Sequence, residues 1–240
     1  MHKLLFDIGN TRLKWALLKD GIMLQQQGLS HDAVNDDAIS EIIAESGCEQ
    51  LYVANVTGVE IEQRLRSIAR QLGISEPVFI RTQSQAFDVT NAYDEPQRLG
   101  VDRWLAMVAT RSICRQAFYV IDAGSAVTID AVDAHGQHLG GLIAPGFRNM
   151  MNALVHNTNL STDEWAPPQQ VVVLENNTQQ AMLGGCAAAV AGLISQQVPD
   201  DARLFLTGGD ADWIAGLLDR DYELIEELVL LGVARYAEVA

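Results

Sequence analysis

The sequence predicts an α/β protein built from two similar halves, each with three strands in a meander followed by alternating helices and strands. The first observation behind this prediction is a motif that occurs twice, at residues 4–11 and 119–126. Each copy has an apolar run, Asp-x-Gly, a small polar residue and a second run. The second observation is that the same order of strand-like and helix-like segments follows both copies. We therefore expect two domains, residues 1–115 and 116–240.

The first half opens with a meander, because the turn Lys19-Asp20-Gly21 separates two strand-like runs. Apolar residues at helical spacing, such as Ile61, Leu65 and Ile68, predict a later helix. In chain order we expect strands at 3–8, 12–18 and 22–29, a helix at about 35–46, a strand at 51–54, a helix at about 58–72, a strand at 78–80 and a helix from Asp102 to about Ile113.

The second half repeats this plan. The turn at His135-Gly136 separates the second and third strands, and Pro145-Gly146 precedes a helix. We expect strands at 117–122, 127–132 and 137–143, a loop over 157–169, a helix at about 178–197, a strand at 203–207 ending in Gly208-Gly209-Asp210, and a helix at about 226–238.

Composition bounds the possible functions. Nearly half of the 240 residues are apolar and the formal net charge is −15, which indicates a globular protein that should repel nucleic acid and anionic membrane. Cys48, Cys114 and Cys186 are far apart and lack C-x-x-C spacing, so we expect structural thiols in a reducing compartment rather than a zinc site or disulfides. The sequence shows neither a signal peptide nor an apolar stretch of membrane-spanning length, so a cytoplasmic location is expected.

The repeated Asp-x-Gly motif is suited to binding phosphate. A buried strand delivers a carboxylate to a glycine turn, where backbone N–H groups can approach a phosphate without a Cβ in the way. A single copy could equally be an ordinary turn closed by an aspartate. The duplication, together with Gly208-Gly209 after a late apolar strand, favours a phosphate and metal site in an ATP-using enzyme, formed by two turns facing each other across a cleft. The signatures of P-loop and Rossmann proteins are absent from the sequence.

These glycine turns resemble those of the acetate and sugar kinase, actin and heat-shock-chaperone ATPase superfamily, whose fold is a duplicated ribonuclease H-like domain with a nucleotide cleft. A closer resemblance is to type III pantothenate kinases. It rests on DIGNTRLK at 7–14, YDEPQRLGVDR at 93–103, GGLIAPG at 140–146 and NTQQAMLG at 177–184, which occur in that family's order.

The resemblance implies an ATP-dependent phosphorylation of pantothenate to 4′-phosphopantothenate for coenzyme A synthesis, in a homodimer. It implies that Asp102 accepts the proton, that Asp7 lies near Mg²⁺ and that Asp122 holds a monovalent cation, K⁺ or NH₄⁺. It implies ATP contacts from Asp7, Ile8, Gly9, Asn10, Thr11, Arg12, Leu13, Lys14 and Ser125, the last standing where many members have Thr. Pantothenate contacts are implied for Tyr93, Gly100, Val101, Asp102, Arg103 and Thr178, with Thr178 acting from the partner subunit.

The chemistry of the reaction is consistent with Asp102 and Arg103. Phosphoryl transfer to an alcohol needs an aligned hydroxyl, charge neutralisation and a carboxylate to accept the proton. A guanidinium can pair in bidentate fashion with the one carboxylate of the substrate, and Gly100 permits close approach of that substrate. The structural alternative is that Asp102 is a first-turn acid favoured by the helix dipole and Arg103 a solvated charge.

Several other residues have open interpretations. Lys14 and Arg12 share a strand face and either face the nucleotide or are solvated edge charges. Asp130 either shares the Asp122 site or caps a turn. His135 and His138 are expected to face solvent because they flank a turn glycine. Core packing is expected for Met150 and Met151, and a core or interface position for Trp104 and Trp213.

Two other functions remain open on the sequence alone. One is a regulatory protein that binds ATP on the same fold without turning over pantothenate, although such a protein would not need the acid–arginine pair at 102–103. The other is a kinase of a different small hydroxy acid, because a fold does not fix its substrate.

Overall fold

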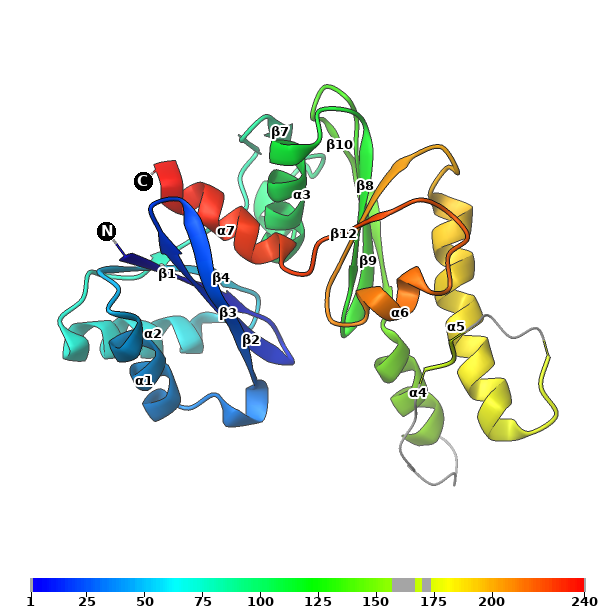
Figure 1. Ribbon diagram of the computed structural model, residues 1–240, viewed down its shortest axis with the longest axis horizontal. Coiled ribbons are helices and arrows are strands. Elements are labelled where there is room, and N and C mark those ends of the chain that lie inside the picture. The colour runs from blue at the N-terminus through cyan, green and yellow to red at the C-terminus, as the bar shows by residue number, and fades with distance from the viewer. Residues whose placement is uncertain (1, 157–166, 170–173, 240) are drawn as a thin grey trace. The chain divides into compact units, whose positions relative to one another are not determined.

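The computed structural model describes residues 2–156, 167–169 and 174–239. It divides into two compact units (Figure 1), residues 1–113 with 227–240 and residues 114–226. Their sheets have matching strand orders, β3-β2-β1-β4-β5 and β10-β9-β8-β11-β12. The duplicated α/β organisation predicted from the repeated motif is therefore present in the fold.

The first unit is a five-stranded sheet with helices on both faces (Figure 1). Its strands are β1 (His2–Ile8), β2 (Arg12–Lys19), β3 (Ile22–Ser30), β4 (Gln50–Asn55) and β5 (Val78–Phe79). Helices α1 (Asp36–Ser46) and α2 (Val59–Leu72) bury their apolar stripes against the sheet face that carries Leu4, Phe6 and Ile8. Each of these helices ends at a glycine in the left-handed conformation, Gly47 and Gly73.

The opposite face of this sheet packs against α3 (Val101–Ile113) and α7 (Leu228–Val239). From the sequence we expected the last helix to belong to the second domain, residues 116–240, whereas α7 packs in the first unit. There α7 approaches α3 closely, because a Cβ on Gly232 would lie 2.7 Å from both the carbonyl carbon and the Cβ of Leu105. Two short strands, β6 (Gln85–Ala86) and β7 (Val89–Thr90), and two 3₁₀ turns, η1 (His31–Ala33) and η2 (Pro96–Arg98), complete the unit.

The second unit repeats the meander and sheet. Its strands are β8 (Phe118–Ala123), β9 (Ala126–Val132), β10 (His138–Pro145), β11 (Arg203–Thr207) and β12 (Glu223–Leu224), and its helices are α4 (Phe147–His156), α5 (Thr178–Gln197) and α6 (Ala211–Ala215). Apolar residues of α5 and α6, including Val190, Ile194 and Ile214, pack on the sheet in one core cluster. Residues 157–166, most of the expected loop at 157–169, lie outside the described residues.

Several packing predictions are confirmed. Met151 is buried, Met150 packs beside it, and the Trp213 ring contacts Phe147. Trp104 is fully buried. All three cysteines are free and buried. Within the described residues, no helix is long and apolar enough to cross a membrane.

Candidate active site

The first Asp-x-Gly turn lies at the carboxyl end of β1. The Gly9 N–H donates to the Arg12 carbonyl oxygen at 3.0 Å, which closes the turn between β1 and β2. Asp7 lies directly opposite Lys14 in the antiparallel register, so the two side chains are on the same face of the sheet. The Lys14 ammonium is 3.0 Å from a Glu227 carboxylate oxygen just before α7. Because β2 lies between β1 and β3, Lys14 is not an edge-strand charge, whereas Arg12 is exposed.

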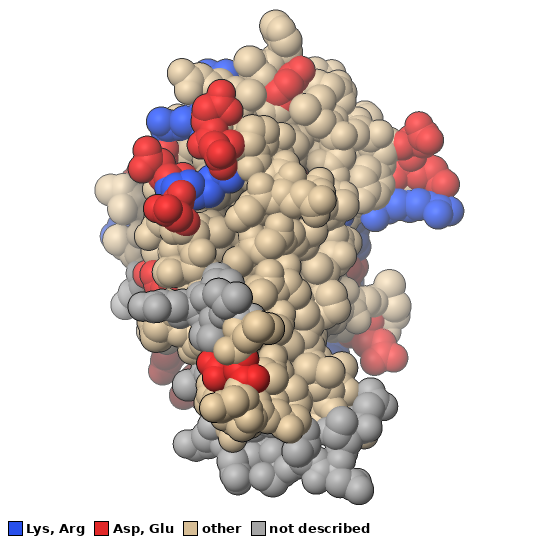
Figure 2. Space-filling model, turned by 90° about the vertical axis from the view of Figure 1, so that its right-hand side faces the viewer, with Lys and Arg blue, Asp and Glu red and all other residues tan. Residues whose placement is uncertain are grey.

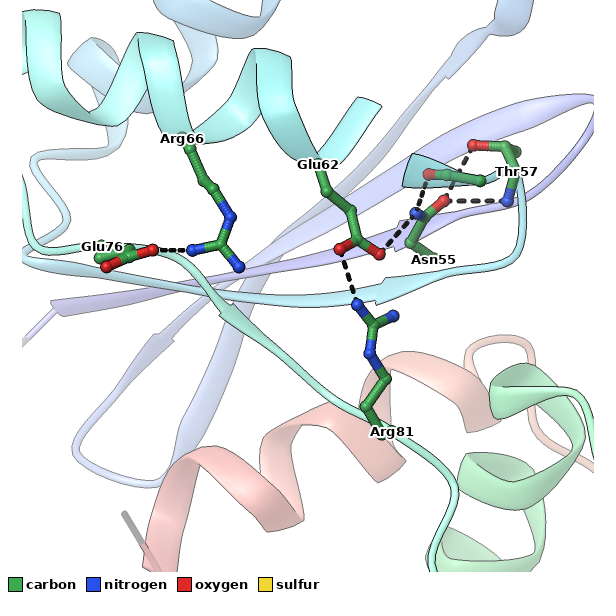
Figure 3. Close-up of polar contacts among 7 residues, drawn as sticks. Asn55, Thr57, Glu62, Arg66, Glu76 and Arg81 are labelled. Carbon is green, nitrogen blue, oxygen red and sulfur yellow. Dashed lines mark hydrogen bonds and ion pairs between the residues drawn. The ribbon is translucent and has the colours of Figure 1, made fainter. Parts of the chain in front are cut away.

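A buried polar network fixes the loop next to this turn (Figure 3). Asn55, the last residue of β4, is the parallel neighbour of Ile8. Its side-chain oxygen accepts hydrogen bonds from the Thr57 N–H at 2.9 Å and the Thr57 hydroxyl at 2.8 Å. Its amide nitrogen donates to the Gly58 carbonyl at 2.7 Å and to Glu62 at 3.1 Å. The residue 55–58 loop, which leads into α2, is thereby held beside the carboxyl end of β1.

Glu62 is a buried charge in this network. Its second carboxylate oxygen accepts from the Arg81 guanidinium at 2.6 Å (Figure 3). That hydrogen bond from Arg81 holds the pKa of Glu62 below its ordinary value, with a further contribution from Asn55. Sequence reasoning missed Glu62 because an acid in the first turn of a helix is normally a surface residue. The available signal was Asn-x-Thr-Gly at residues 55–58, a capping-type sequence just before the helix.

Asp102 and Arg103 lie in the first turn of α3, which begins with the Trp104 N–H donating to the Gly100 carbonyl at 3.0 Å. An Asp102 carboxylate oxygen accepts from the Arg103 N–H at 2.8 Å, and a Cβ on Gly100 would lie only 2.5 Å from that oxygen. Glycine at position 100 therefore leaves room for the Asp102 carboxylate.

Arg103 is not a solvated surface charge. The residue is 6% exposed, and its guanidinium donates to the Tyr93 hydroxyl at 3.1 Å. The structure thus brings together two of the residues that the sequence grouped as substrate contacts, although they lie on different elements. A buried guanidinium beside a phenol is suited to binding a carboxylate, because both groups can donate hydrogen bonds to it.

In the second unit, Asp122 lies on β8 opposite Thr128 of β9 and Thr207 of β11. Glycines make the close approaches at this end of the sheet. A Cβ on Gly208, whose φ is 96°, would lie 2.7 Å from the Ala123 carbonyl carbon, and one on Gly146 would lie 2.9 Å from the Ser125 oxygen. The Gly146 N–H donates to the Ser125 oxygen at 2.9 Å. The turns that follow β8, β10 and β11 therefore converge on one edge of the second sheet.

Asp210 is a functional candidate that the sequence analysis did not assign. Its N–H donates to the Ala123 oxygen at 2.9 Å, which holds the Gly208-Gly209 turn against the end of β8. Burial raises the pKa of the Asp210 carboxyl, and the Arg148 charge opposes that shift. A partly desolvated acid at the glycine-lined edge is a common feature of binding sites.

The expectation that His138 faces solvent is wrong. His138 is 1% exposed, and its Nε2 lies 3.0 Å from an Asp130 carboxylate oxygen. Asp130 is buried as well, so it does not cap a surface turn. His138 lies opposite Val132, two residues along β9 from Asp130, so the two side chains are diagonal neighbours across the strand pair.

Thr178 is the first residue of α5, and Asn177 caps the helix by accepting from the Gln180 N–H at 2.9 Å. A groove of about 670 Å³ lies beside it between α4 and α5, lined by Met150, Leu154 and Met182 among others. The 20 residues of α5 include no charged side chain. Figure 2 shows the side of the molecule on which α5 lies in Figure 1, and mostly uncharged residues cover that side.

The described residues contain no cluster of three or more His, Cys, Asp or Glu that could hold a metal ion by themselves. A single carboxylate such as Asp7 is nonetheless chemically compatible with Mg²⁺. Mg²⁺ is commonly bound by one or two carboxylates together with substrate phosphates and water.

Comparison with known proteins decides the family. A family model described as type III pantothenate kinase matches residues 3–200. The chain is 38% identical over 242 residues to the type III pantothenate kinase of Dechloromonas aromatica (strain RCB), covering 96% of this chain and 97% of the relative. It is 34% identical over 238 residues to that of Aromatoleum aromaticum, covering 96% of each. The chain belongs to the type III pantothenate kinase family.

This kinase also resembles solved structures in fold. A Campylobacter jejuni protein assigned to the Baf family of transcriptional activators matches with a TM-score of 0.66 at 22% identity, over 99% of this chain and all of that one. The activator of 2-hydroxyisocaproyl-CoA dehydratase from Clostridium difficile, with bound ADPNP, matches with a TM-score of 0.58 at 13% identity, over 99% and 94%. The predicted actin-like α/β fold is confirmed, and the enzyme is an ATP-using kinase of pantothenate.

Proposed function

We propose that Asp102 accepts the proton of the pantothenate primary hydroxyl while Arg103 and Tyr93 bind the carboxylate end of the substrate. The observation that carries this proposal is the hydrogen bond between the buried Arg103 guanidinium and the Tyr93 hydroxyl, one residue from Asp102. Gly100 and Val101 belong to the same turn and complete this set of pantothenate contacts. In the reaction the substrate oxygen forms a bond to the γ-phosphorus, the bond to the ADP oxygen breaks, and the hydroxyl proton passes to Asp102.

For ATP, we propose contacts from residues 7–14 in the first unit and from Ser125 in the second. The closed turn at Gly9 supports this proposal, because a tight glycine turn presents backbone N–H groups to phosphate oxygens. Lys14, on the same sheet face as Asp7, supplies a cation. When bound, Mg²⁺ held by Asp7 and a monovalent cation, K⁺ or NH₄⁺, held by Asp122 would neutralise phosphate charge.

The test is ADP release from ATP with and without pantothenate, in potassium and then in sodium buffer. We expect turnover that depends on pantothenate and on potassium, and a decrease in kcat of roughly 10²–10⁴-fold in Asp102→Asn. Asp94→Asn is the matched control, because Asp94 is an exposed acid of the same segment. ATP binding without any response to pantothenate would refute the assignment and favour a regulatory nucleotide-binding role. A panel of other hydroxy acids would test the choice of substrate.

We further propose that the enzyme is a homodimer in which Thr178 contacts pantothenate bound by the partner subunit. The apolar groove beside Thr178 and the uncharged α5 support this arrangement, because such faces are uncommon on monomers. Light scattering at micromolar concentration should give the mass of a dimer, and a monomer would refute the role of Thr178 across an interface. A cytoplasmic location remains a prediction from the sequence.

A further inference from the structure

The hairpin formed by β6 and β7 has an unusual turn. Its central residues, Phe87 and Asp88, have φ angles of 50° and 60°. A two-residue hairpin turn with both φ angles positive normally uses Asn-Gly or Asp-Gly, and a bulky residue in this conformation is strained. Such strain persists only where the surrounding structure enforces it, and it is concentrated at functional sites. The contacts of Phe87 are therefore informative.

Phe87 packs on α7. Its ring lies edge-to-face on the Tyr236 ring, with centroids 4.7 Å apart and an interplanar angle of 69°. The Arg235 guanidinium lies 6.0 Å from the centre of the Phe87 ring. Because two strands of two residues each are not stable alone, these contacts anchor the hairpin.

The anchored hairpin leads directly into the proposed pantothenate site. Asn91, which follows β7 and is 9% exposed, accepts from the Tyr93 N–H at 2.9 Å through its side-chain oxygen. The Asn91 side-chain nitrogen lies 3.3 Å from the carbonyl oxygens of Gln83 and Pro96. The Asn91 backbone N–H donates to the Ser84 carbonyl oxygen at 2.8 Å. The position of Tyr93 is thus coupled to that of the hairpin.

Tyr236 also contacts the other side of this site. Its hydroxyl accepts a hydrogen bond from the Trp104 indole N–H at 2.9 Å. Trp104 is fully buried and immediately follows Arg103, which donates to Tyr93. Burial raises the pKa of the Tyr236 hydroxyl, and the hydrogen bond from Trp104 opposes that shift. Together with the chain from Phe87 to Asn91 and the peptide bond between Arg103 and Trp104, these contacts form a closed circuit that begins and ends at Tyr236.

We propose that Tyr236 is a positioning residue of the pantothenate subsite. Through Phe87 it holds the hairpin that carries Tyr93, and through Trp104 it holds the helical turn that carries Arg103. It touches neither substrate nor reacting atoms in this role. The inference rests on the proposed function, in which Tyr93 and Arg103 bind the substrate.

The test compares Tyr236→Phe, which keeps the ring on Phe87 but removes the hydroxyl, with Tyr236→Leu, which removes both contacts. Tyr222→Phe in the second unit is the matched control. We expect the KM for pantothenate to rise about three- to tenfold in Tyr236→Phe, as for the loss of one hydrogen bond, and further in Tyr236→Leu. The KM for ATP should stay within about twofold. Amide hydrogen exchange over residues 84–93 should accelerate in Tyr236→Leu.

A double-mutant cycle separates positioning from a general loss of stability. If Tyr236 acts through Arg103 and Tyr93, the effect of Tyr236→Phe on pantothenate KM should fall below about twofold in a Tyr93→Phe background. Full additivity, equal changes in both KM values, or unchanged exchange over 84–93 would overturn the inference while wild-type turnover still supports the proposed function. A wild-type enzyme that releases no ADP in response to pantothenate would overturn both.

Discussion

Replacing Gly232 by alanine sets two effects of opposite sign against each other. Gly232 lies inside α7, where alanine is normally the better helix former by about 0.5–1 kcal/mol. The added Cβ, however, would lie 2.7 Å from two atoms of Leu105 and still nearer to its carbonyl oxygen, whereas ordinary van der Waals contact begins near 3.4 Å. Two of these three atoms, the carbonyl carbon and oxygen of Leu105, belong to the backbone of α3, so they cannot move by rotating a side chain.

The steric effect should therefore dominate. Overpacking of a rigid contact costs about 1–3 kcal/mol, which leaves a net loss of about 1–2 kcal/mol in the free energy of unfolding of Gly232→Ala. Gly192→Ala is the matched control, because Gly192 also lies inside a helix, α5, and its Cβ would meet nothing within 4 Å. The control should be more stable than the wild type by up to about 1 kcal/mol.

Urea unfolding followed by circular dichroism measures both variants against the wild type. Opposite signs for the two glycines are the expected result. If Gly232→Ala were as stable as Gly192→Ala, the close packing of α7 on α3 would not exist in solution, and the assignment of α7 to the first unit would lose its physical basis.

Two other changes test the edges of the sheets. Glu62→Gln should lower the free energy of unfolding by about 1 kcal/mol at pH 7, less than for a fully buried charged hydrogen bond because the Arg81 side chain is 58% exposed. The pKa of Glu62 in the folded protein is held below its ordinary value of 4.5. The stabilisation is therefore complete above pH 4.5 and is lost as the pH falls through the folded-state pKa. Urea unfolding curves of the variant and the wild type should thus converge at acid pH. Gly208 has a φ of 96° and lies close to Ala123, so Gly208→Ala should lower the free energy of unfolding by about 2 kcal/mol or more in the same assay. Gly209→Ala is the control and should change the free energy of unfolding little, because its Cβ would meet nothing within 4 Å.

The elements whose ends are clearly marked were predictable from the sequence. Helix α5 and strand β11 have the predicted bounds, 178–197 and 203–207, because their apolar runs end at clear turn or capping residues. The β6–β7 hairpin was missed because its strands have two residues each and its turn is Phe-Asp rather than a recognised glycine turn. The strand propensities of residues 85–90 carry no information about Tyr236, whose ring packs on Phe87 from a helix far along the chain.

The candidate site shows the same division between local and non-local information. The motif around Gly100 and Asp102 is local, and in the structure its glycine leaves room for the Asp102 carboxylate. The burial of Arg103 and of His138 depends on partners, Tyr93 and Asp130, whose proximity follows from packing and strand register. A charged residue looks like a surface residue in the sequence until such a partner is known.

The return of α7 to the first unit has a consequence for protein synthesis. One face of the β1–β2 pair, which includes the fully buried Leu5 and Ala16, packs against helices that include α7, and the Lys3 ammonium donates to the Ala237 carbonyl near the end of that helix. The ribosome makes these strands before α7, with the whole second unit between them. A nascent chain ending at Ile113 would therefore expose part of an apolar sheet face. The first unit is therefore completed only after the second unit has been made, and its apolar face is prone to aggregation throughout that interval.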